Sequence, residues 1–146
     1  MTHSIEIAGR KIGVGHPCYI IAELSANHGH KLENALELVR VAKESGADAV
    51  KLQTYRADTL TIDCDAEPFM IGKGTAWEGR RLYNLYEEAF LPWEWHEPIF
   101  QEAARLGIHC FSSPFDDTSI DFLENLNVPA YKIASFELID HGLIAR

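Results

Sequence analysis

Two lysines lie within short apolar segments of this sequence, which is an unusual setting for a cation. Lys51 is part of the segment AVKLQ at 49–53, and Lys132 is part of AYKIA at 130–134. Lysine is seldom fully buried unless an opposite charge or an acceptor pairs with it. Because side chains alternate between the two faces of a strand, both lysines would face away from their apolar neighbours. We expect them to converge on one cavity, where their ammonium groups could hold a phosphate or a carboxylate.

Other polar residues stand at the ends of the predicted strands and could complete such a site. Glu23 ends the first apolar run, and Gln53 shares a strand face with Lys51. Ser113 and Ser135 end two later runs. In a parallel sheet, reactive groups gather at the carboxyl ends of the strands. The serine hydroxyls would add donors for the anion, and Glu23 would serve as an acid, a base or an acceptor for a sugar hydroxyl.

Two other interpretations of the lysines stay open at this point. A single lysine in an apolar run often lies on an edge strand and extends its ammonium group to water. The matching positions of Lys51 and Lys132 in two different strands favour a shared anion site instead. A lysine can also form a Schiff base with a carbonyl substrate, and the sequence does not separate that role from anion binding.

The histidines are weaker signals. The segment NHGH at 27–30 could supply metal ligands, but two such histidines at a helix start are more often caps or surface residues. His96 and His109 are isolated in the sequence, and we expect them to be structural. We therefore assign no metal ligand to this chain.

The elements that must position these residues alternate between strands and helices. A small hairpin is expected over 1–16, and a long polar connection runs over 55–93 with one helical patch at 81–90. The other strands are expected at 18–24, 47–53, 108–113 and 130–135, and the other helices at 31–45, 94–106, 118–126 and from 139 onward. This alternation is typical of an α/β protein with a parallel sheet. So long a connection is usually functional, and its aromatic and charged residues suit a loop that covers a substrate.

Local signals predict where the helices end. Gly46 and Gly107 directly follow two of the apolar-periodic segments, and glycine is the residue most often found just past a helix C-terminus. Asp117 or Thr118 is expected to cap the helix over 118–126, because an acceptor side chain at that position satisfies free backbone N–H groups.

Composition narrows the class of protein. The chain has 146 residues with 13 Lys+Arg and 22 Asp+Glu, for a formal net charge of −9, which argues against nucleic-acid binding. Its three cysteines, Cys18, Cys64 and Cys110, are far apart and fit reduced thiols better than disulfides. The sequence shows no signal peptide and no segment that could span a membrane, so we expect a cytoplasmic protein.

Four segments taken together resemble the N-terminal half of the sialic acid synthase family. They are IAELSANHGH, ADAVKLQTY, FSSPFD and YKIAS, in this order and at the family's spacing. The resemblance implies a TIM (β/α)8-barrel, of which this chain would supply the hairpin over 1–16 and βα units 1–4 over 17–146, with four parallel strands. The second half of the barrel and the family's antifreeze-like domain would be absent, so we expect this fragment alone to be inactive.

The resemblance also implies an activity. Members of the family condense phosphoenolpyruvate with an N-acetylated amino sugar to form a nine-carbon 2-keto acid, and they release phosphate. The segment over 69–96 is most similar to pseudaminic acid synthases, which use 2,4-diacetamido-2,4,6-trideoxy-altrose. An N-acetylneuraminate or legionaminate synthase is the alternative, and a catalytically silent anion-binding half-barrel is a second one.

Carried over by position, the resemblance gives each candidate residue a role. Residues that match contacts to the phosphate and carboxylate of phosphoenolpyruvate are Lys51, Ser113, Lys132 and Ser135. Glu23 matches a catalytic carboxylate beside the acceptor sugar, and Gln53 matches a polar contact in the same place. The resemblance further implies Mn²⁺ or Mg²⁺ in the full-length enzyme, with ligands that have no counterpart in this chain. It also implies a homodimer when the enzyme is full length.

Overall fold

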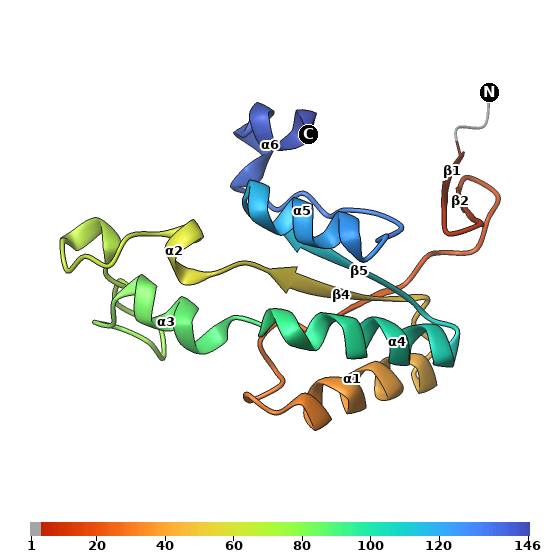
Figure 1. Ribbon diagram of the computed structural model, residues 1–146, viewed down its shortest axis with the longest axis horizontal. Helices are drawn as coiled ribbons and strands as arrows, with labels where there is room; N and C mark the ends of the chain where they lie inside the picture. The colour runs from red at the N-terminus through yellow and green to blue at the C-terminus, as the bar shows by residue number, and fades with distance from the viewer. Residues whose placement is uncertain (1–3) are drawn as a thin grey trace.

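Three parallel strands form the main sheet of the structure, a computed structural model that describes residues 4–146 (Figure 1). The strands are β3 (Ile21–Glu23), β4 (Ala49–Thr54) and β5 (His109–Pro114), and their order is β3-β4-β5. A separate antiparallel hairpin consists of β1 (Ser4–Ile7) and β2 (Arg10–Gly13), as predicted. Residues 1–3 of the predicted hairpin segment lie outside the described residues.

Long helices connect the strands and cover one face of the sheet. They are α1 (Leu32–Glu44), α4 (His96–Leu106) and α5 (Asp117–Asn125), close to the predicted ranges. Figure 1 shows α1 and α4 side by side along the sheet, with α4 and α5 flanking β5. Two of these helices, α1 and α4, bury a stripe of small or branched side chains at helical spacing that meets the sheet in the core: Ala35, Val39 and Ala42 of α1, and Ile99 and Ala103 of α4.

The central strand β4 has two chemically different faces. Val50 and Leu52 are at most 1% exposed and belong to the core that the helices cover. Lys51 and Gln53 alternate with them and therefore occupy the opposite face. The predicted division of this strand is confirmed: its apolar residues pack on helices, and its polar residues face away from them.

The predicted fourth strand over 130–135 is not a strand, so that prediction is wrong. The segment contacts the sheet through one parallel bridge between Tyr131 and Ser112, and the Lys132 N–H donates to the Ser112 carbonyl over 3.1 Å. The segment follows Pro129, and the chain turns at Ser135. Its single bridge to β5 among the described residues makes the segment an edge contact one residue long.

The connection between β4 and α4 is folded, not extended. It contains α2 (Ala57–Leu60), η1 (Glu67–Phe69), α3 (Leu82–Ala89) and η2 (Trp93–Trp95), and α3 confirms the predicted helical patch. The chain closes with η3 (Glu137–Ile139) and α6 (His141–Ala145). Within residues 4–146, no helix is both long and apolar enough to cross a membrane.

Two helices end at the predicted glycines, whereas the helix α5 does not begin at the predicted cap residue. Gly46 and Gly107 have φ of 86° and 64°, the left-handed conformation that glycine allows past a helix end. The N-cap of α5 is Asp116, whereas the sequence predicted Asp117 or Thr118. Asp116 is extended, and its side chain accepts from the N–H groups of Thr118 and Ser119 at 2.8 and 3.1 Å. Asp117 is already helical, so its side chain cannot reach back to those donors.

Replacing the cap should therefore be costly, whereas replacing its neighbour should not. Asp116→Ala is expected to lower the free energy of unfolding by about 1 kcal/mol, the usual contribution of an N-cap side chain. Asp117→Ala, which removes an exposed carboxylate from the first turn, is the matched control and should cost clearly less. Urea unfolding followed by circular dichroism measures both. Equal losses in the two variants would contradict the cap assignment.

Candidate functional site

The buried lysine of β4 has a carboxylate beside it. Lys51 is 5% exposed, and its Nζ lies 3.4 Å from Oε1 of Glu23. The two residues are register partners in the parallel pair of β3 and β4, so their side chains leave the sheet on the same face. The Glu23 side chain is 59% exposed, so this pair has one buried member and one that solvent can reach. The ammonium group thus has a counter-ion that a ligand could displace or share.

A second polar row lies one step closer to the carboxyl ends of the strands. Gln53 of β4 is in register with Ser113 of β5, and both lie on the face of Lys51. Ser113 is 1% exposed, and its Oγ has no hydrogen-bond partner among the described residues. A buried hydroxyl left without a partner costs about 1–3 kcal/mol. The hydroxyl is therefore available to donate to an oxygen of a bound molecule.

The other two candidate residues lie beyond the edge of the sheet. Lys132 is half-buried, and its backbone is attached to β5 through Ser112. Tyr131 is bridged to Ser112, so alternation puts Lys132 on the face of Ser113. Ser135 lies in an exposed turn past the bridge. The structure thus brings Glu23, Lys51, Gln53 and Ser113 into two adjacent rows, with Lys132 at their border and Ser135 further out.

A buried polar cluster occupies the opposite, helix-covered face of the same strand ends. Oγ1 of Thr54 lies 2.8 Å from Nε2 of His96 and 2.7 Å from Oγ of Ser112, and all three residues are 0% exposed. Burial lowers the pKa of His96 to about 4, so its imidazole is neutral near pH 7. The prediction that His96 is structural agrees with this burial. Thr54 did not emerge from the sequence, although its place one residue past Gln53 implied the helix-covered face.

The two histidines of the NHGH segment contact each other, and His28 also contacts Trp95. Nδ1 of His28 accepts a hydrogen bond from the backbone N–H of His30 over 3.2 Å, and the two rings lie 5.6 Å apart, edge to face. Burial lowers the pKa of His28, and its ring also packs against Trp95. Over residues 4–146 no three His, Cys, Asp or Glu side chains lie close enough together to hold an ion. The donors that a divalent metal would need are not assembled in this part of the chain.

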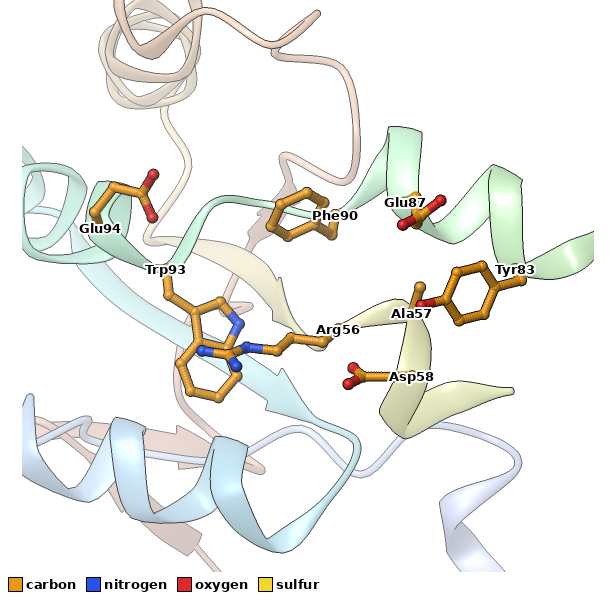
Figure 2. A pocket seen from close by; sticks show the side chains of 8 residues that line it. All are labelled: Arg56, Ala57, Asp58, Tyr83, Glu87, Phe90, Trp93 and Glu94. Atoms are coloured by element: carbon orange, nitrogen blue, oxygen red, sulfur yellow. The ribbon is translucent and has the colours of Figure 1, made fainter. Parts of the chain in front are cut away.

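The folded connection after β4 borders a separate, open cavity of about 350 Å³ (Figure 2). The Arg56 guanidinium lies 4.4 Å from the centre of the Trp93 ring, a cation–π contact that Figure 2 shows from close by. Three carboxylates line the cavity as well, namely Asp58, Glu87 and Glu94. None of the six candidate residues lines this cavity, so it is not the anion site that the sequence predicted.

The chain is similar in sequence to several curated synthases. The chain is 53% identical over 126 residues to the pseudaminic acid synthase of Campylobacter jejuni, a match covering 86% of this chain and 36% of that protein. It is 44% identical over 126 residues to the N,N'-diacetyllegionaminic acid synthase of Legionella pneumophila, covering 86% of this chain and 35% of that protein. The chain therefore spans just over a third of the length of these curated relatives.

A solved structure and a family model also match this chain. The crystal structure of N-acetylneuraminic acid (sialic acid) synthetase from Leptospira borgpetersenii, in complex with citrate, matches with a TM-score of 0.81 and 26% identity. That match covers 99% of this chain and 45% of the other chain. The sheet and helices described above are accordingly part of an α/β barrel of the TIM type. The model of the NeuB family matches residues 38–146, and the chain belongs to that family.

Proposed function

We propose that this chain carries the N-terminal part of the phosphoenolpyruvate site of a nonulosonic acid synthase. The observation that supports this most strongly is a buried ammonium group on the same face of the sheet as a buried hydroxyl that has no hydrogen-bond partner among the described residues. Lys51 and Ser113 lie on one face, at the carboxyl ends of neighbouring parallel strands. The chain as a whole carries a formal net charge of −9, so a buried cation here is a local feature that matches a local anion.

The anion is held by charge and by directed donors. The Lys51 ammonium group and the Ser113 hydroxyl donate to oxygens of the phosphate or the carboxylate of phosphoenolpyruvate. Lys132 and Ser135, from the segment beyond β5, contribute to the same charged end of the substrate. The sialic acid synthetase that resembles this chain was solved with citrate, which is also a small polyanion.

The acceptor sugar lies on the solvent side of these rows, beside Glu23 and Gln53. In the proposed reaction, C3 of phosphoenolpyruvate forms a bond to the aldehyde carbon of the open-chain sugar, whose oxygen becomes a hydroxyl group. Water adds at C2, and the bond between C2 and the phosphate oxygen breaks, which leaves the 2-keto acid and inorganic phosphate. The exposed carboxylate of Glu23 is the group here that can exchange a proton with the sugar.

The two polar rows do not by themselves identify the metal or the acceptor sugar. The family resemblance implies Mn²⁺ or Mg²⁺, but residues 4–146 do not assemble ligands for it. The higher identity to pseudaminic acid synthases than to the legionaminic acid enzyme favours 2,4-diacetamido-2,4,6-trideoxy-altrose as the acceptor. A legionaminic or sialic acid precursor is the second candidate.

Direct titration tests the anion half of this proposal. Phosphoenolpyruvate added to the 146-residue chain is expected to bind saturably with one site, as measured by calorimetry and by ³¹P NMR. The affinity should fall as salt is added, because the contact is charge-assisted. Pyruvate, which lacks the phosphate, is the matched ligand control and should bind more weakly. Binding that does not saturate at millimolar concentrations, or equal binding of pyruvate, would overturn the proposal.

A further inference from the structure

We propose that His96 is a positioning residue for the candidate anion site. Its imidazole orders the hydroxyls of Thr54 and Ser112, and these hold the ends of β4 and β5 together directly behind Gln53 and Ser113. The inference rests on the proposed function, since it concerns the geometry of that same site. It adds residues from the opposite face of the sheet, none of which touches the substrate.

The donor and the acceptor of each hydrogen bond in this cluster can be assigned in one consistent way. Nδ1 of His96 lies 3.4 Å from the Pro92 carbonyl, which can only accept, so Nδ1 carries the proton. Nε2 of the neutral ring must then accept from the Thr54 hydroxyl. The Thr54 oxygen, having given its proton to His96, accepts from Ser112 over 2.7 Å. The histidine thus sets the orientation of both hydroxyls.

The register of the sheet places this side-chain contact at the carboxyl ends of the two strands. Thr54 and Pro114 are register partners, and each is the last residue of its strand. Gln53 and Ser113 lie one residue earlier, on the opposite face. The hydrogen bond between Thr54 and Ser112 therefore joins β4 and β5 at the level of the candidate anion site.

Packing stability alone would not favour this arrangement. The rest of the helix-covered face of β4 is apolar, and Val50 and Leu52 are packed with helix residues. Burying three polar side chains there costs free energy unless every partner is well placed. A buried network in which every polar group has a partner fixes one defined geometry, and this effect is larger than its contribution to net stability. His96 also begins α4 and is bonded to Pro92, so it joins the strand ends to the return of the long connection.

Two variants of Thr54 separate the hydroxyl from the shape of the side chain. Thr54→Val keeps the shape and removes the hydroxyl, so both His96 and Ser112 lose their partner. Thr54→Ser keeps the hydroxyl and loses one methyl group. In the 146-residue chain, we expect Thr54→Val to weaken phosphoenolpyruvate binding by about five-fold, roughly the contribution of one hydrogen bond. Thr54→Ser should restore the wild-type affinity to within about two-fold, even if both variants are less stable.

Supporting measurements keep the test decisive. The ¹⁵N shifts of His96 should report a proton on Nδ1 in the wild type. If Thr54→Val does not fold, Ser112→Ala takes its place, because it removes the far hydroxyl with a smaller change in packing. Equal affinity of wild type and Thr54→Val, or equal losses in Thr54→Val and Thr54→Ser, would overturn the positioning role while leaving the anion site intact. A wild-type chain that does not bind phosphoenolpyruvate would remove the proposed function, and this inference with it.

Discussion

Lys51→Met is expected to lower the affinity of this chain for phosphoenolpyruvate at least ten-fold while leaving the chain folded. A hydrogen bond to a charged group contributes about 1.5–3 kcal/mol, and each 1.4 kcal/mol corresponds to a factor of about ten in affinity. Methionine is similar to lysine in length and lacks the charge. The substitution therefore removes the ammonium group from the anion site without opening a large cavity.

The stability of the Lys51→Met variant should change little for two reasons. A buried charge costs desolvation free energy, which methionine does not incur. The carboxylate that loses its partner belongs to Glu23, whose side chain is 59% exposed and can be hydrated by water. Urea unfolding should give a free energy within about 1 kcal/mol of the wild type, because the lost ion pair is open to solvent on its Glu23 side.

The matched control for this experiment is Lys11→Met on the exposed strand β2. It makes the same change in net charge, far from the candidate rows in the sequence and in a different sheet. Calorimetric titration of the two variants distinguishes a site from a bulk charge effect. Equal weakening in both, or no weakening in Lys51→Met, would contradict the assignment of Lys51 to the anion.

Leu52→Ala, one residue further along the strand, is expected to have the opposite phenotype. Leu52 is 1% exposed and packs in the core between the sheet and the helices. Truncating a fully buried leucine costs about 2–5 kcal/mol, because the apolar contacts are lost and a cavity remains. Whole domains are stable by about 5–15 kcal/mol, so this loss is a large fraction of the total. The folded fraction of the variant should still bind phosphoenolpyruvate with wild-type affinity.

Urea unfolding followed by circular dichroism measures the loss, with Val41→Ala as control. Val41 is an apolar residue of α1 that is 46% exposed, and shortening it should cost less than about 0.5–1 kcal/mol. Similar losses in Leu52→Ala and Val41→Ala would show that the helices do not bury β4 as described. A selective loss of binding in Leu52→Ala would contradict the division of the strand into two faces.

The parts of the fold that were predictable from sequence are those set by local signals. The alternation around Lys51 identified the two faces of β4, and glycine positions identified two helix ends. The strand expected at 130–135 failed because strand formation depends on a partner, and β5 offers this segment a single bridging residue. The N-cap at Asp116 was missed by one position because a cap depends on backbone conformation, which neighbouring acidic residues do not reveal.

The candidate site was predictable to the extent that it follows strand register. Side chains alternate along a strand, and parallel strands end at the same edge of the sheet. These two rules predicted one shared face for Glu23, Lys51, Gln53 and Ser113. The ion pair between Glu23 and Lys51 did not follow from spacing, since 28 residues separate the two in the sequence. The cluster of His96, Thr54 and Ser112 was out of reach for the same reason: it depends on how α4 packs on the sheet.

The register of β4 and β5 also has a consequence for the order of events in folding. Gln53 and Ser113 are paired across a separation of 60 residues, so their row cannot form until that long loop has closed. Parallel pairings between distant segments form slowly, because the entropy of closure precedes any gain from contacts. A ligand bridging these rows meets a complete site only after that loop has closed. Such a ligand stabilises the native state by slowing its unfolding, and it leaves the rate of folding nearly unchanged.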